Sequence, residues 1–201
     1  MRARLTPLLA TLLLAACGPL VQVGGNDKAP PMLLTLRATT TLATPPAAKP
    51  ATIMVVLPAA TGALQTLRLP VTIADTEIKY LTGATWSEQP NRLFRRVLAD
   101  TIVAHGLIVI DPRGPSPRAD MTLSGALTEF GLDVRDPAAA RVNVRYEAVL
   151  NASNGALIAA RRFDASEPVT SQSPADVGAA LNNAANTVAA DAATWVAGNL
   201  K

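Results

Sequence analysis

Apolar and polar residues alternate with the period of a β-strand in two long segments of this chain. In the first, Met121, Leu123 and Leu127 are separated by polar or small residues. In the second, every other residue of 142–150 is apolar and most of the residues between are polar or charged. Because side chains of a strand point alternately to its two faces, each segment predicts a strand with one buried face.

Two features predict how these strands continue. The alternation of the first strand slips by one position near Glu129, Phe130 and Gly131, which predicts a β-bulge. After the second strand, the pair Asn154-Gly155 is typical of a tight hairpin turn. We therefore expect an antiparallel partner strand in residues 156–163.

Shorter apolar runs predict the remaining strands. β-Branched and aliphatic residues concentrate in 32–41, 53–57 and 107–110, and a weaker run covers 77–81. The run at 107–110 is followed by a turn-rich loop up to Pro117.

A helical period begins near Ser87 and continues to His105. Four aliphatic residues between positions 93 and 102 share one face at helical spacing. Ser87 is a candidate N-cap, Pro90 suits the first turn, and Gly106 is a natural stop. The sequence therefore predicts one helix over residues 87–105.

A second helix is predicted near the end of the chain. Ser173, Pro174 and Asp176 form a favourable helix start. Apolar side chains from Val177 to Trp195 then follow helical spacing, and the asparagines at 182, 183 and 186 lie largely off that face.

Together these elements predict an α+β fold, in which a mixed or antiparallel sheet carries two main helices. We expect one domain, residues 32–201, and find no internal repeat. The prolines of 43–50 predict a lengthened loop between two early strands. Trp86 and Trp195 are expected to be buried packing anchors, with partner contacts as the alternative.

The first residues predict an exported protein. Arg2 and Arg4 precede an apolar run from Leu5 to Ala16, which is 12 residues long. A helix that crosses a bilayer needs about 20 residues, so the run indicates a secretory signal peptide, residues 1–16.

The residues that follow predict lipid attachment. The segment 14–18, Leu-Ala-Ala-Cys-Gly, resembles the bacterial lipobox, in which the cysteine is acylated and the signal removed. Cys17 is the only cysteine of the chain, so it has no partner for an internal disulfide. We predict that Cys17 is lipidated and that residues 17–31, with three glycines and three prolines, act as a tether.

Charge and composition argue against nucleic-acid binding. The chain has 18 basic and 15 acidic residues, and loss of Arg2 and Arg4 with the signal lowers the net charge from +3 to +1. Aromatic residues make up 3% of the chain, too few for base-stacking platforms.

Several segments resemble one family, the ABC-type transport auxiliary lipoproteins (PqiC-like), over about 32–195. The most specific are residues 84–90, Ala-Thr-Trp-Ser-Glu-Gln-Pro, and 95–99, Arg-Arg-Val-Leu-Ala. Residues 119–130 and the closing alanine-rich helix ending in Trp195 also match. The chain departs from the family at Leu33 and Leu34, where tyrosines are usual, and at Thr76, where a proline is frequent.

The resemblance implies an accessory lipoprotein without catalysis. Members work with ABC transporter subunits and an MCE-domain protein that move lipids between membranes. It implies an outer-membrane, periplasmic-face location, and Gly18 after the cysteine resembles the corresponding sorting pattern. A homo-oligomer is compatible with the sequence. A lipoprotein that assists assembly or regulation of another envelope complex remains an alternative.

A periplasmic hydrolase is the alternative of another class. His105 is the only histidine, and its place at a helix end favours a capping or surface role. No nucleophile elbow, phosphate-binding glycine loop or metal-ligand spacing is present in the sequence. We therefore expect no catalytic residue, no metal and no cofactor.

Arg92, Arg95 and Arg96 are the candidate binding residues. They fall on neighbouring positions of the first predicted helix. One interpretation is a solvated helix face, and the other is a contact with anionic head groups or an acidic partner.

Overall fold

The computed structural model describes residues 31–40, 50–111 and 118–200. The predicted signal peptide, Cys17 and nearly all of the tether lie outside these residues, as does most of the proline-containing insertion at 43–50 and of the loop that ends at Pro117.

The fold is a mixed sheet with two helices packed on it, which confirms the predicted α+β class. Three long strands form its antiparallel part. Two short strands follow at one side and run parallel to the nearest of these long strands. In spatial order they are β10 (Leu157–Pro168), β9 (Arg141–Ala152), β8 (Met121–Asp133), β2 (Thr52–Val55) and β7 (Ile108–Ile110).

The long strands follow the apolar pattern of the sequence. Alternate side chains of β9 from Val142 to Leu150 are buried, and the others point to the opposite face. In β8 the register shifts between Leu127 and Glu129, so that Thr128 is the extra residue of a bulge. The predicted slip and the predicted hairpin between β9 and β10 are both confirmed.

Smaller strands complete the sheets, and the apolar pattern did not predict all of them. β3 (Ala59–Ala60) and β4 (Pro70–Ala74) pair with β8, and β5 (Glu77–Tyr80) pairs with β4. β6 (Ala84–Trp86) pairs with β1 (Met32–Leu34) in a separate parallel sheet. Of these, β5 was predicted, whereas β3, β4 and β6 are too short or too polar in pattern to stand out. Two single turns of 3-10 helix also occur, Gly62–Leu64 and Pro137–Ala139.

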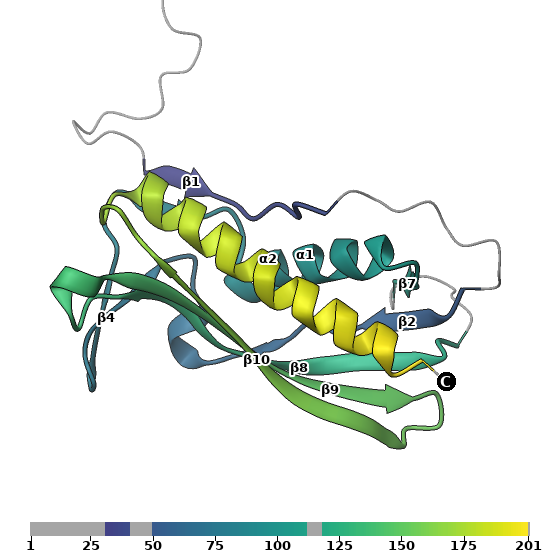
Figure 1. Ribbon diagram of the computed structural model, residues 1–201. Coiled ribbons are helices and arrows are strands. Elements are labelled where there is room, and N and C mark those ends of the chain that lie inside the picture. Colours follow the sequence, from purple (N-terminus) through teal and green to yellow (C-terminus); the bar gives the residue numbers. More distant parts are fainter. Residues whose placement is uncertain (1–30, 41–49, 112–117, 201) are drawn as a thin grey trace, which may run out of the picture.

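Both α-helices lie on the same face of the sheet, and β8–β10 have no helix on the other face (Figure 1). Helix α1 spans Pro90–Ala104 and α2 spans Pro174–Gly198. Within the described residues, neither helix has both the length and the apolar character needed to cross a membrane.

The helix starts agree with the prediction in one case and not in the other. Ser173 caps α2, because its Oγ accepts a hydrogen bond from the backbone of Asp176. The expectation for Ser87 was wrong: α1 begins at Pro90 after Gln89, and no side chain caps it. Ser87 instead donates its backbone N–H to the carbonyl of Leu34, which continues the pairing of β1 with β6.

Aromatic rings fill the space between the helices and the sheet. Trp86 and Phe130 meet edge to face with ring centroids 5.4 Å apart, and Phe94 lies 5.2 Å from Tyr146. All four rings are buried. Trp86 is therefore a packing anchor as predicted, whereas Trp195 is only half-buried and packs edge to face on Phe163.

The first predicted strand, 32–41, is only partly a strand. After β1, residues 35–40 leave the small sheet and run along α2 as an extended segment, here called the strap (Figure 1). Two asparagines of α2 bind its backbone: Asn182 accepts from the N–H of Arg37 at 2.8 Å, and Asn186 accepts from that of Thr39 at 2.8 Å. A helix, not a neighbouring strand, therefore satisfies these backbone groups.

Candidate functional site

The three predicted arginines lie along one edge of the buried face of α1. Leu93, Phe94 and Val97 point into the core. Arg95 lies three residues after Arg92, and Arg96 lies four residues after it. Residues three and four apart are neighbours on a helix surface, so the guanidinium groups gather on one side.

These arginines line a surface cavity of about 550 Å³. Its wall combines α1, the residue Glu88 just before it and two residues that follow β2. We call this cavity the arginine groove, lined by Val56, Leu57, Glu88, Arg92, Arg95, Arg96 and Ala99. With three guanidinium groups and one carboxylate, its lining carries a net charge of +2.

The three arginines differ in their partners. Arg95 donates from Nε to the carbonyl oxygen of Val55 at 2.8 Å, which ties α1 to the end of β2. Arg96 forms an ion pair with Glu88. The side chain of Arg92 is exposed and makes no hydrogen bond or ion pair with another described residue.

The groove therefore has the chemistry of an anion-binding surface. Guanidinium groups bind carboxylates and phosphates through paired hydrogen bonds, and Arg92 has no competing partner among the described residues. The groove lining contains no serine, cysteine or histidine that could act as a nucleophile or as a histidine base.

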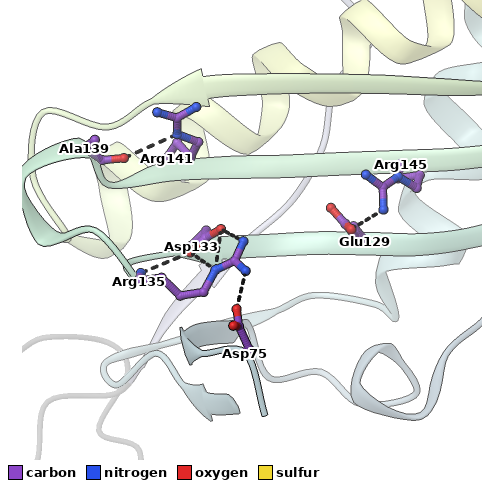
Figure 2. A network of polar contacts seen from close by, with 7 residues as sticks. All are labelled: Asp75, Glu129, Asp133, Arg135, Ala139, Arg141 and Arg145. Atoms are coloured by element: carbon purple, nitrogen blue, oxygen red, sulfur yellow. Dashed lines mark hydrogen bonds and ion pairs between the residues drawn. The ribbon is translucent and has the colours of Figure 1, made fainter. Parts of the chain in front are cut away.

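A second charged cluster lies on the face of the sheet that carries no helix. Arg135 binds Asp133 and, at 2.8 Å, Asp75 from the turn between β4 and β5 (Figure 2). Arg145 of β9 forms ion pairs with Glu129 of β8 and Asp164 of β10. Each of these arginines thus joins two carboxylates, and the cluster links β8, β9 and β10 with the β4–β5 hairpin.

The charges of this cluster are largely satisfied within the protein. The hydrogen bond and charge of Arg135 hold the pKa of Asp133 below its usual range, and Asp133 in turn raises the pKa of Arg135. For Asp164, burial alone would raise the pKa, but the hydrogen bond and charge of Arg145 outweigh it and lower the pKa. The cluster therefore has a structural role, and the arginine groove is the better binding candidate.

We expect Asp133→Asn to make the free energy of unfolding less dependent on pH at acidic pH. The pKa of Asp133 is lower in the folded than in the unfolded state, so its ion pair stabilises the protein above the unfolded-state value of about 4. This contribution is lost as the pH falls through the folded-state pKa. Urea unfolding measures the effect. Relative to the wild type, the variant should lose up to about 1 kcal/mol of unfolding free energy at pH 7 and less at pH 3.

The matched control is Asp191→Asn. Asp191 is exposed on α2 and has no polar partner among the described side chains. An equal effect of both substitutions at both pH values would contradict the role given to Asp133.

His105 occupies the end of α1, as the sequence predicts. Its Nδ1 lies 2.9 Å from the carbonyl oxygen of Thr101, so it carries the proton, and Nε2 faces the hydroxyl of Thr194 at 3.3 Å. Nδ1 thus binds within α1, whereas Nε2 joins the end of α1 to α2. In the ranges that the structure describes, no cluster of three or more His, Cys, Asp or Glu side chains could hold a metal ion.

The structure adds residues that the helical spacing alone did not identify. Leu57 and Glu88 line the same groove as the arginines, although they come from outside α1. Helical spacing could not predict the ion pair between Glu88 and Arg96. The two residues are eight apart, and Glu88 precedes the helix. Cys17, the predicted lipidation site, lies outside the described residues.

Comparison with known proteins identifies one matching family. The family model for the ABC-type transport auxiliary lipoprotein component matches residues 34–193. A comparison with curated protein sequences finds no match.

Solved structures share the fold at low sequence identity. A crystal structure of a protein from Xanthomonas campestris has a TM-score of 0.69 and 20% identity, covering 83% of this chain and 94% of its own. A crystal structure of an uncharacterized protein has a TM-score of 0.66 and 16% identity, covering 84% and 99%. A hypothetical protein from Chlamydia trachomatis has a TM-score of 0.52 and 9% identity, covering 75% and 98%.

Proposed function

The chain belongs to the family of ABC-type transport auxiliary lipoprotein components, and from this membership we propose that it is a non-catalytic accessory of an MCE-type lipid transport system. In this proposal it binds the MCE-domain protein and the ABC transporter subunits. It does so from the outer membrane, on the periplasmic side, where a lipid on Cys17 anchors it.

The observation that carries the proposal is the family match over residues 34–193, which extends over nearly the whole described domain. The match agrees with the resemblance seen in the sequence. The lipobox-like residues 14–18 support the anchor independently, because they lie outside the matched range. The anchoring role requires more than one acyl chain, since a single chain gives only marginal membrane binding.

The structure is compatible with a role in binding. The described surface carries a groove lined by arginines, and the sheet face without a helix is polar. The arginine groove and four other cavities of the described residues have charged or polar residues in their lining, so they suit contacts with polar groups better than enclosure of an acyl chain.

The anchor can be tested by a Cys17→Ala variant expressed behind an ordinary cleavable signal peptide. We expect the wild-type protein in the membrane fraction and the variant in the soluble periplasmic fraction, because loss of two or more acyl chains removes most of the membrane affinity. Mass spectrometry of the amino-terminal peptide should find the acyl groups on Cys17. An unmodified Cys17 in the mature protein would contradict the anchor.

The transport role can be tested by affinity recovery of the tagged, acylated protein from crosslinked envelopes. We expect an MCE-domain protein and transporter subunits to be recovered, and their yield to fall for Cys17→Ala. Recovery of other envelope proteins, without any transport component at any crosslinker dose, would overturn the transport assignment. It would favour a role in another envelope complex.

A further inference from the structure

The arginine groove offers two kinds of contact side by side. From α1 come the guanidinium groups, and from the segment after β2 come Val56 and Leu57. Leu57 is 41% exposed, although it is a large aliphatic side chain. A ligand that fits this groove should therefore bring a negative charge together with an apolar group.

We propose that the arginine groove docks an acidic segment of a protein partner, in which a carboxylate side chain lies next to an aliphatic one. This inference rests on the proposed function, because the partner is then a protein component of the transport system. The carboxylate would bind Arg92 and Arg95, and the aliphatic side chain would cover Leu57.

The charge distribution in the groove carries this assignment. Arg96 already holds a carboxylate, that of Glu88, so the groove accommodates the ion pair that we propose for a partner. Arg95 uses Nε for the carbonyl of Val55, and among the described residues its side chain makes no other hydrogen bond or ion pair. Its two terminal nitrogens and the whole guanidinium of Arg92 therefore remain available for a ligand.

A protein segment fits the groove better than a lipid head group does. A phosphate would use the arginines but would leave Leu57 exposed. Arginine is enriched and lysine is depleted in protein interfaces, and the groove lining contains three arginines and no lysine.

The test places a photocrosslinking amino acid at position 57 of the full-length acylated protein, in envelopes of the native cell. Leu57 is exposed, so the substitution should leave the fold unchanged. We expect an adduct with a transport component, in a segment that contains Asp or Glu. The same experiment with Arg92→Glu should lower the adduct yield about tenfold, because a close charge pair is replaced by repulsion.

The matched control is Arg37→Glu. Arg37 is exposed on the strap, and among the described residues only its backbone makes hydrogen bonds. It should leave the yield unchanged. In addition, replacing the acidic residue of the crosslinked partner segment by arginine should restore the yield with Arg92→Glu. Thermal melts of both variants check that each is folded.

The possible results separate this inference from the proposed function. If affinity recovery still yields transport components, but position 57 gives no adduct or an adduct insensitive to Arg92→Glu, the docking surface is wrong and the function stands. An adduct with phospholipid, with a second copy of this chain or with a segment lacking Asp and Glu also overturns the inference. If no transport component is recovered at all, both proposals fall.

Discussion

A Gly125→Ala variant is expected to lose more than about 3 kcal/mol of stability, or to fail to fold. Gly125 lies in β8 and pairs with Ala148 of β9. A Cβ at this position would lie 2.0 Å from the carbonyl oxygen of Glu147 and 2.8 Å from the ring of Tyr146. The oxygen belongs to the backbone of a central strand, so relief requires the two strands to separate.

The tyrosine ring cannot move away cheaply either. Tyr146 is fully buried, packs on Phe94 and donates its hydroxyl to the carbonyl oxygen of Ser124 at 3.1 Å. Burial also raises the pKa of this hydroxyl, so it stays protonated and remains a donor at neutral pH. A shift of the ring would therefore open the core and break a buried hydrogen bond.

Denaturant unfolding followed by circular dichroism measures the effect. Gly198→Ala is the control, because Gly198 ends α2 and a Cβ there meets nothing within 4 Å. Alanine at a helical position should change stability by no more than about 1 kcal/mol, in the stabilising direction. An unfolding midpoint of Gly125→Ala equal to that of the wild type would show that β8 and β9 do not approach so closely.

Asn186→Ala is expected to cost about 2–4 kcal/mol, because it leaves two backbone groups of the strap without partners. Asn186 is 9% exposed. Its Oδ1 accepts from the N–H of Thr39 at 2.8 Å, and its Nδ2 donates to the carbonyl oxygen of Arg37 at 2.9 Å. One amide thus satisfies a donor and an acceptor of the same extended segment, as a neighbouring strand would.

The strap should respond before the rest of the domain. Hydrogen exchange of the Thr39 amide is expected to accelerate strongly in Asn186→Ala, while amides of β8 and β9 keep their protection relative to global unfolding. Asn183→Ala is the control, since Asn183 is exposed on the same helix and its side chain makes no hydrogen bond within the described ranges. Equal effects of the two substitutions would mean that the amide of Asn186 does not hold the strap.

The candidate site was predictable only in part. Helical spacing was enough to place Arg92, Arg95 and Arg96 on one side of a helix, because it depends only on the local period. It could not show that Leu57 lies in the same groove. That juxtaposition depends on where β2 ends relative to α1, and this is set by the pairing of β2 with β7 and β8.

The sequence by itself determined the class of this fold and its most regular elements. Long alternating runs such as 142–150 predict a half-buried strand because the side-chain period is local, and the cap at Ser173 is visible because its partner is three residues away. The family resemblance was also visible at this level, and the match over residues 34–193 confirms it. The strand pattern and the helix cap both depend on residues close together in the chain.

Only the tertiary structure decided how the short elements are used. Residues 32–41 have the composition of one strand, yet only Met32–Leu34 pairs in a sheet, because Asn182 and Asn186 of α2 bind the backbone that follows. Ser87 has the chemistry of a helix cap, but its backbone continues the pairing of β1 with β6. In both cases the partner lies far away in the chain, and no local period can indicate a hydrogen bond to a residue that only the folded chain brings near.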